Sequence, residues 1–187
     1  MRYYKIIKDD VLNGTGFRTT LVITRCQFNC VGCHAQHLKD PCAGEPFTDE
    51  VKEELFKELS KDYISGFSIF GGEITHEENI DDVTKLFKEI KEKFPNKTIW
   101  AWTGMRFDDV KDKEFIKYVD VLIDEPFVLS RRNLKCNYRG SDNQHIISVQ
   151  ESLKQGKMIL AKEYYEELEA LSWIILLKNI ALWKYNI

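Results

Sequence analysis

The sequence lacks the features that mark several large classes of protein. Its amino terminus, Met1 to Lys5, is charged and no long apolar run follows it, so we expect neither a secretory signal nor a transit peptide, and we expect a cytoplasmic protein. The 27 basic and 30 acidic residues are spread along the chain, and no Lys/Arg stripe forms a face that could follow a phosphate backbone. Nucleic acid is therefore not expected as a direct partner. Internal repeats and low-complexity segments are also absent.

An even set of cysteines suited to disulfides is absent too. The chain has five cysteines, and three of them, Cys26, Cys30 and Cys33, lie within eight residues in the order C-x3-C-x2-C. A reducing cytosol disfavours disulfides, so metal binding or redox chemistry explains this cluster better. Cys42 and Cys136 have no role in that pattern.

Short β-branched or aromatic runs alternate with helical patterns along the chain. The expected strands are residues 3–7, 19–24, 67–70, 98–102 and 121–123. The expected helices are residues 51–59 behind the cap Thr48, residues 80–94 stopped by Pro95, and residues 108–118. This alternation predicts an α/β fold with a mainly parallel sheet and functional loops at the carboxyl ends of its strands. Because too few strands are present for eight, we expect a partial (open) βα barrel.

The three clustered cysteines directly follow the apolar run Thr19 to Thr24, so the end of a strand presents three thiols in one short loop. Such a loop can hold three irons of a four-iron cluster and leaves the fourth iron without a protein thiolate. Zinc is an alternative, with His34, Cys42 or Cys136 closing a tetrahedral site. Cys30 to His34 also match the C-x-x-C-H pattern of haem attachment, which leaves Cys26 without a function. Inert buried cysteines are the plainest alternative.

A second motif falls at the end of the next expected strand and therefore at the same edge of the sheet. Phe70 is followed by Gly71, Gly72 and Glu73. The two glycines would let a ligand approach the backbone, and Glu73 adds a carboxylate that can accept a hydrogen bond from an ammonium group. Gly-Gly is also ordinary punctuation between a strand and a loop, so this motif alone would indicate no function.

Together, the cysteine spacing and the Gly-Gly-Glu motif resemble the radical S-adenosylmethionine superfamily. Within it, residues 99–104, 118–124 and 139–144, with Asn13 to Gly16 before them, resemble successive blocks of the anaerobic ribonucleoside-triphosphate reductase activating proteins. The match covers about residues 3–155 in the expected order. In this chain Arg25 stands where the family usually has a small residue, and Glu125 stands where glycine is common. Ala35 and Ile74 replace the asparagine and the proline that are usual there.

The resemblance implies a cofactor set and a reaction. Cys26, Cys30 and Cys33 would hold a [4Fe-4S] cluster, and S-adenosylmethionine would bind at its open iron, with Gly71, Gly72, Glu73, Thr103 and Asp124 as cofactor-binding residues. The reaction would be the reductive cleavage of S-adenosylmethionine to place a glycyl radical on the large subunit of the anaerobic reductase. An external electron donor is implied, and no membrane is.

Two other functions are compatible with these residues. A small radical enzyme acting on a free metabolite, similar to deazapurine synthases, could have the same cysteine loop. A zinc-binding interaction module is the alternative outside enzymes. Colour separates the zinc module from either radical enzyme, because an iron-sulfur protein is brown and a zinc protein is colourless.

The last part of the chain lies beyond the resemblance. We expect one domain over residues 1–157 and a helical extension over residues 158–187, in which apolar residues crowd from Leu171 to Leu177. Lys178 interrupts a run already too short for a membrane span, which needs about 20 mostly apolar residues. We expect the extension to cover an open side of the barrel, with docking to a second copy or to the reductase as the alternative.

Overall fold

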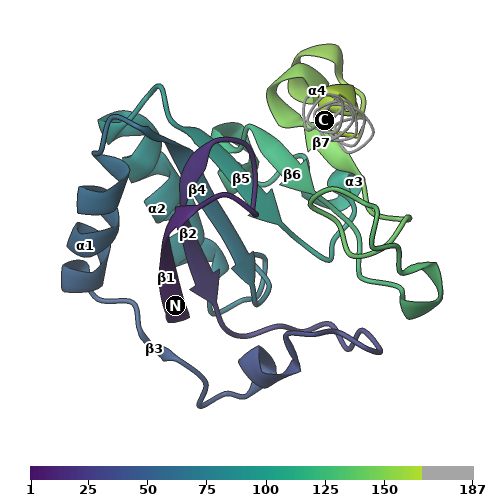
Figure 1. The fold of residues 1–187 in the computed structure, drawn as a ribbon, viewed down its shortest axis with the longest axis horizontal. Coiled ribbons are helices and arrows are strands. Elements are labelled where there is room, and N and C mark those ends of the chain that lie inside the picture. The colour runs from purple at the N-terminus through teal and green to yellow at the C-terminus, as the bar shows by residue number, and fades with distance from the viewer. Residues whose placement is uncertain (166–187) are drawn as a thin grey trace, which may run out of the picture.

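The computed structural model describes residues 1–165, which form a mixed α/β fold around one seven-stranded sheet (Figure 1). The strands are β1 (Arg2–Asp10), β2 (Phe17–Ile23), β3 (Glu45–Pro46), β4 (Ile64–Gly71), β5 (Thr98–Trp102), β6 (Val121–Ile123) and β7 (Ile146–Ser148). The helices are α1 (Asp49–Leu59), α2 (Ile80–Lys93), α3 (Phe107–Val110) and α4 (Val149–Gln155), with 3-10 turns η1 (Gln36–Lys39), η2 (Glu114–Tyr118), η3 (Leu129–Arg131) and η4 (Lys162–Tyr164).

The sheet is mainly parallel, as the alternating pattern predicted. Its strand order is β3-β1-β2-β4-β5-β6-β7. The four central strands β2, β4, β5 and β6 are parallel to one another, whereas β1, β3 and β7 pair antiparallel with their neighbours. The two short edge strands β3 and β7 were not predicted, because two or three residues carry no periodic signal.

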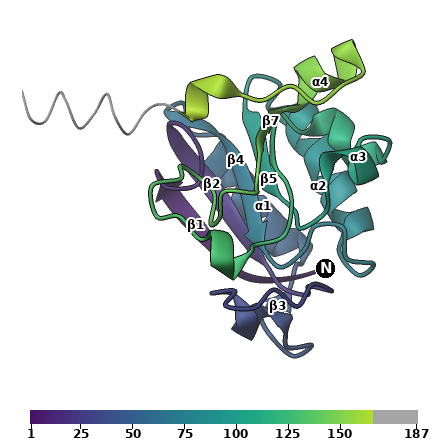
Figure 2. The ribbon, with the colours of Figure 1, turned by 90° about the vertical axis from the view of Figure 1, so that its right-hand side faces the viewer.

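The two faces of the sheet have different partners because successive side chains of a strand alternate in direction. One face packs against α1, α2 and η2 and forms the main core around Leu21, Phe67, Ile69 and Phe87. The other face carries Trp100, Val121, Ile123 and Ile146, against which Tyr138 and the segment ending at Tyr165 pack. Figure 2 shows α2 on one side of the strands and the loop of residues 126–141 on the other.

Arg18 fastens the amino ends of three neighbouring strands. Its guanidinium group is fully buried and donates to the Ser68 hydroxyl, the Phe67 carbonyl and both oxygens of Thr98, as well as to the Thr15 carbonyl. Burial lowers the pKa of Arg18 to about 10, so the group stays charged at neutral pH. All five N–H donors thus have acceptors, which is the condition for burying an arginine.

The predicted third helix over residues 108–118 is wrong. The segment consists of the single turn α3, a turn, and the 3-10 turn η2. Phe107, Val110, Phe115 and Ile116 are all buried. In a continuous helix, which turns about 100° per residue, these four side chains would spread over more than half of the circumference, so only the break lets all of them face the core.

The described part of the expected carboxyl-terminal extension packs on the sheet. Leu160 forms a bridge with Ile147, Ala161 is buried, and the Ile146 amide donates to the Tyr165 hydroxyl. The predictions for residues 166–187 lie outside the described residues. Within residues 1–165, none of the helices has the length and apolar character needed to cross a bilayer.

Candidate metal centre

The carboxyl ends of the parallel strands bring the predicted site residues to one edge of the sheet. Ile23, the last residue of β2, is in register with Gly71, the last residue of β4. The cysteine loop leaves from the first of these ends and Glu73 follows the second, as predicted. Thr103 follows the end of β5, the next strand in the sheet.

One pocket of about 160 Å³ at this edge collects most of these residues. Its lining includes all three clustered cysteines together with Gly71, Gly72, Glu73 and Thr103. Asp124 is not part of the lining. The other lining residues are Phe28, His34, Ala35, Phe70, Trp102, Gly104, Glu125, Pro126, Phe127 and Gln144.

The three loop cysteines are free and half-buried. Burial raises the pKa of the Cys26 thiol, and the neighbouring Glu73 carboxylate adds to this rise. A bound metal centre would offset that cost, because the positive charge of iron stabilises a thiolate. Within residues 1–165, no three His, Cys, Asp or Glu side chains form a group that could hold a single metal ion. In a four-iron cluster the three thiolates bind three different irons, so they need not converge on one point.

The base of the cysteine loop is held tightly against the end of β4. The Gly72 amide donates to the Ile23 carbonyl and the Glu73 amide donates to the Arg25 carbonyl, both at 2.7 Å. A Cβ atom on Gly72 would lie 2.4 Å from the Thr24 and Arg25 carbonyl oxygens. The close approach that requires glycine here is therefore made by the chain's own backbone. The buried side-chain amide of Asn79 also donates to the Thr24 and Glu73 carbonyls.

Glu73 is only 2% exposed, and its carboxylate accepts four hydrogen bonds from groups of the chain. Oε1 accepts from the amide and hydroxyl of Thr75 and from the Thr103 hydroxyl, and Oε2 accepts from the Gly104 amide. Three of these four bonds are to Oε1 and one is to Oε2, so Oε2 keeps an acceptor site. A direct contact between Glu73 and an ammonium group stays a prediction; the observed bonds tie the end of β4 to the end of β5.

Phe28 connects the cysteine loop to this support. A Cβ atom on Gly104 would lie 2.6 Å from the Phe28 ring, so the ring rests directly on the Gly104 backbone. Glu73 fixes the amide of that same glycine at 2.7 Å. The carboxylate, the Gly104 backbone and Phe28 thus form a continuous chain of contacts that ends two residues from both Cys26 and Cys30.

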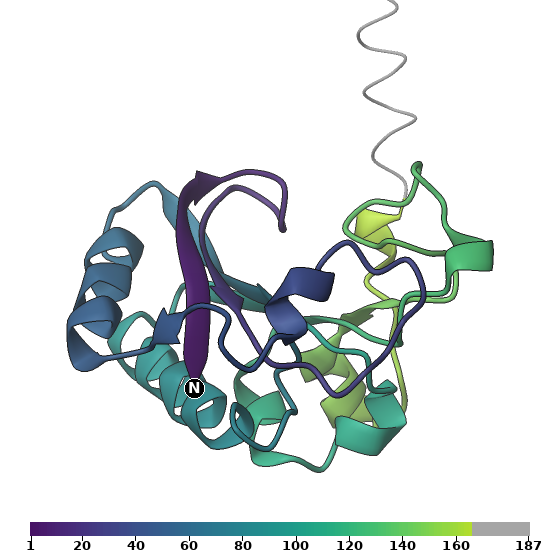
Figure 3. The same ribbon diagram turned by 90° about the horizontal axis from the view of Figure 1, so that it is seen from below.

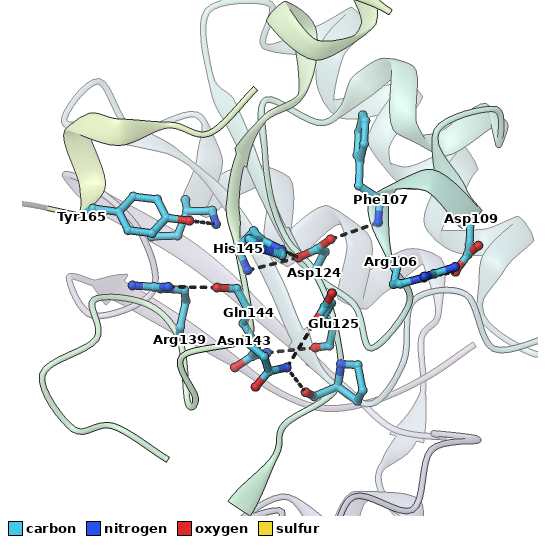
Figure 4. Close-up of polar contacts among 12 residues, drawn as sticks. Arg106, Phe107, Asp109, Asp124, Glu125, Arg139, Asn143, Gln144, His145 and Tyr165 are labelled. Carbon is cyan, nitrogen blue, oxygen red and sulfur yellow. Dashed lines mark hydrogen bonds and ion pairs between the residues drawn. The ribbon is translucent and has the colours of Figure 1, made fainter. Parts of the chain in front are cut away.

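Asp124 does not line the pocket and instead bonds to neighbouring segments of the chain, as Figure 4 shows. Its carboxylate accepts from the Phe107 amide at 3.0 Å and from the amide and Nδ1 of His145 at 3.1 and 2.9 Å. The pocket is instead lined by the next residue, Glu125, which has a left-handed backbone with φ of 66°. That conformation suits the glycine common at this position in the resembled family.

The block from Arg139 to Gln144 folds back on itself and supports Glu125. The side-chain oxygen of Gln144 accepts from the Gly140 and Ser141 amides, and its side-chain nitrogen donates to the Glu125 carbonyl. Arg139 donates to the Gln144 carbonyl and lies over the Tyr165 ring (Figure 4). The residues of this block therefore hold the local conformation of the chain, and Gln144 also lines the pocket.

A larger cavity of about 670 Å³ adjoins the pocket and shares part of its wall, including Cys33, His34, Phe70, Trp102 and Gln144. Its remaining wall comes from Asn13, Gly32 and the loop of residues 127–140. This volume is in the range of small-molecule binding sites, and its mixture of aromatic and polar side chains is typical of them.

Comparison with known proteins agrees with this arrangement. Residues 12–147 match the model of a family described as a 4Fe-4S single cluster domain. The chain thus belongs to a family defined by a domain with a single four-iron cluster.

Curated relatives narrow this class. The chain is 39% identical over 150 residues to the anaerobic ribonucleoside-triphosphate reductase-activating protein of Enterobacteria phage T4. The aligned region covers 79% of this chain and 94% of the relative. The proteins of the same name from Salmonella typhi and Escherichia coli K12 are 33% and 32% identical, each over 77% of this chain and 96% of the relative. The chain belongs to the family of anaerobic ribonucleoside-triphosphate reductase-activating proteins.

Proposed function

We propose that this protein is a radical S-adenosylmethionine enzyme that places a glycyl radical on an anaerobic ribonucleoside-triphosphate reductase. The observation that carries the proposal is the single pocket shared by Cys26, Cys30, Cys33 and the Gly-Gly-Glu motif in a chain of this family. The proposal includes a partial βα barrel of the radical S-adenosylmethionine type for the seven-stranded sheet.

The three thiols fit a [4Fe-4S] cluster, since they are free, half-buried and on the wall of one pocket. Bound there, the cluster would supply the electron that cleaves S-adenosylmethionine to methionine and a 5′-deoxyadenosyl radical able to take a hydrogen atom from a glycine Cα of the reductase. An external donor would reduce the cluster.

In this proposal the chain's own residues bind and orient the cofactor. Gly71, Gly72 and Thr103 line the pocket, and Glu73 holds Thr103 and Gly104 in place. Phe28, Phe70, Trp102 and Phe127 supply apolar surface to the wall of the pocket. The adjoining cavity leaves room for the nucleoside part of the cofactor and for a segment of the target protein.

The test uses the anaerobically reconstituted protein, a chemical reductant, S-adenosylmethionine and the cognate reductase. We expect 5′-deoxyadenosine to form and a glycyl-radical doublet to appear in the electron paramagnetic resonance spectrum only when all components are present. If 5′-deoxyadenosine forms and the doublet never does, the metabolite-acting alternative replaces this proposal. A colourless, zinc-loaded protein would support the binding module.

A further inference from the structure

A loop beside the large cavity carries a concentration of positive charge, and the neighbouring Asp142 carboxylate interacts electrostatically with one of its arginines, Arg131. We define the rim loop as residues 129–135, in which every side chain except that of Asn133 is exposed. Arg131, Arg132 and Lys135 give it three positive charges and it contains no acidic residue, although the whole chain has a net charge of -3. Among residues 1–165, none of these three cations has a carboxylate within ion-pair distance.

The rim loop has a defined conformation. Arg132 forms a bridge with Ser141, and the Asn133 side chain donates to the Asp142 carboxylate at 2.8 Å. The Lys135 amide in turn donates to the side-chain oxygen of Asn133 at 2.9 Å. A loop anchored in this way holds its backbone in one conformation, which lowers the backbone entropy lost when a partner binds.

The rim loop lies directly beside the cysteine loop, as Figure 3 shows. A Cβ atom on Gly32 would lie 3.0 Å from Leu129, so the two loops are in contact. Leu134 and Arg132 line the large cavity together with Cys33. Leu134 is 83% exposed and Val31, on the cysteine loop, is 74% exposed. The entrance to the cavity is thus bordered by exposed apolar side chains and by unpaired cations.

We propose that the rim loop is a docking surface for an acidic protein surface, namely the face of the reductase that flanks the segment inserted into the cavity. This inference rests on the proposed function. Unpaired cations around a cavity that must admit part of another protein favour an acidic partner and speed its approach. A protein fits better than nucleic acid, because the exposed leucines Leu129 and Leu134 lie on either side of the two arginines in the sequence and offer apolar contact area that a phosphate backbone cannot use.

The test is a double charge reversal, Arg131→Glu with Lys135→Glu, at two exposed residues that line neither the pocket nor the cavity. The matched control reverses two exposed lysines elsewhere, Lys57→Glu with Lys154→Glu, and changes the net charge equally. Affinity for the cognate reductase is measured anaerobically at several salt concentrations on the cluster-loaded full chain. Reductant-dependent cleavage of S-adenosylmethionine without the reductase serves as the check on the site itself.

We expect the rim-loop variant to bind the reductase at least about tenfold more weakly at low salt, with a smaller salt dependence, while the control binds like the unaltered protein. Cleavage of S-adenosylmethionine should be unchanged in both. Equal binding by the variant and the control overturns the docking surface alone. Absence of binding by the unaltered chain overturns the proposed function as well. Loss of binding to an oligonucleotide, with reductase binding intact, assigns the loop to nucleic acid and overturns the inference.

Discussion

At the scale of single residues, the five cysteines divide into two groups. Cys26, Cys30 and Cys33 line one pocket, whereas Cys42 is exposed and Cys136 donates to the Asp142 carboxylate. We expect Cys26→Ala, Cys30→Ala and Cys33→Ala each to lose iron and the brown chromophore, because no other group replaces a missing iron ligand. Cys42→Ala and Cys136→Ala are the controls and should keep both. Full iron content in all three loop variants would contradict the assignment.

Glu73 is expected to act through the groups that it holds. Glu73→Ala removes the acceptor for the buried Thr103 hydroxyl and the Gly104 amide, so we expect S-adenosylmethionine affinity to fall roughly ten- to a hundredfold and the free energy of unfolding to fall by about 2 to 4 kcal/mol. Thr103→Val removes one of these hydrogen bonds at nearly constant shape and should reproduce part of the loss of affinity. Unchanged binding by Thr103→Val, with weak binding by Glu73→Ala, would instead indicate direct contact between Glu73 and the cofactor.

Glu125 occupies a backbone conformation that favours glycine. Its φ of 66° costs a residue with a Cβ atom about 1 kcal/mol. We expect Glu125→Gly to be about 1 kcal/mol more stable than Glu125→Ala, because both variants lose the bond from Asn143 and only glycine relieves the backbone. Denaturant unfolding of the two variants measures this difference. Equal stability would show that the surrounding loop relaxes to accommodate the side chain.

At the scale of elements, the turn between β1 and β2 depends on an ionised Asp10. Burial raises the pKa of Asp10, but hydrogen bonds from Thr20, Asn13 and Leu12 outweigh it, and the net pKa lies below the ordinary value of 3.8. A carboxyl group with a lowered pKa in the folded state stabilises the protein above its unfolded pKa, and this stabilisation is lost as the pH falls through the folded value. The contribution is therefore constant near neutrality and declines below pH 3.8.

Urea unfolding of the unaltered protein and of Asp10→Asn between about pH 6 and about pH 3 tests this expectation. The stability difference between the two should shrink as the acid range is entered, because the variant has no carboxyl group to titrate at this position. A difference that stays constant down to the lowest pH would mean that Asp10 titrates alike in the folded and unfolded states.

At the scale of the whole molecule, the segment around Tyr165 belongs to the described fold. A chain ending at Lys157 loses the Leu160 bridge, the buried Ala161 and the Tyr165 contacts with Ile146 and Arg139. We expect it to be destabilised by at least about 3 kcal/mol relative to a chain ending at Tyr165, which keeps every contact described here. Thermal unfolding and iron content of the two truncated proteins check this. Similar melting temperatures would place the boundary of the fold before residue 158.

Several features of the fold and the site could be predicted from the sequence because they depend on local order. The alternation of strands and helices determined a mainly parallel sheet, and parallel strands place their carboxyl ends at one edge. The C-x3-C-x2-C spacing put three thiols in a single loop at such an end, and Gly71 to Glu73 followed at the next strand. These expectations needed only the chain direction and the period of the side chains.

The tertiary structure alone decided the contacts between residues that are far apart in the chain. The sequence did not show that Glu73 would accept hydrogen bonds from Thr103 and Gly104, or that Asp124 would accept from Phe107 and His145 and leave the pocket wall to Glu125. The break between α3 and η2 arose because four apolar side chains had to reach one core. A buried polar group forms hydrogen bonds, and a buried apolar side chain packs, with whichever residues the fold brings near. Packing of the whole chain determines these partners, and local spacing does not.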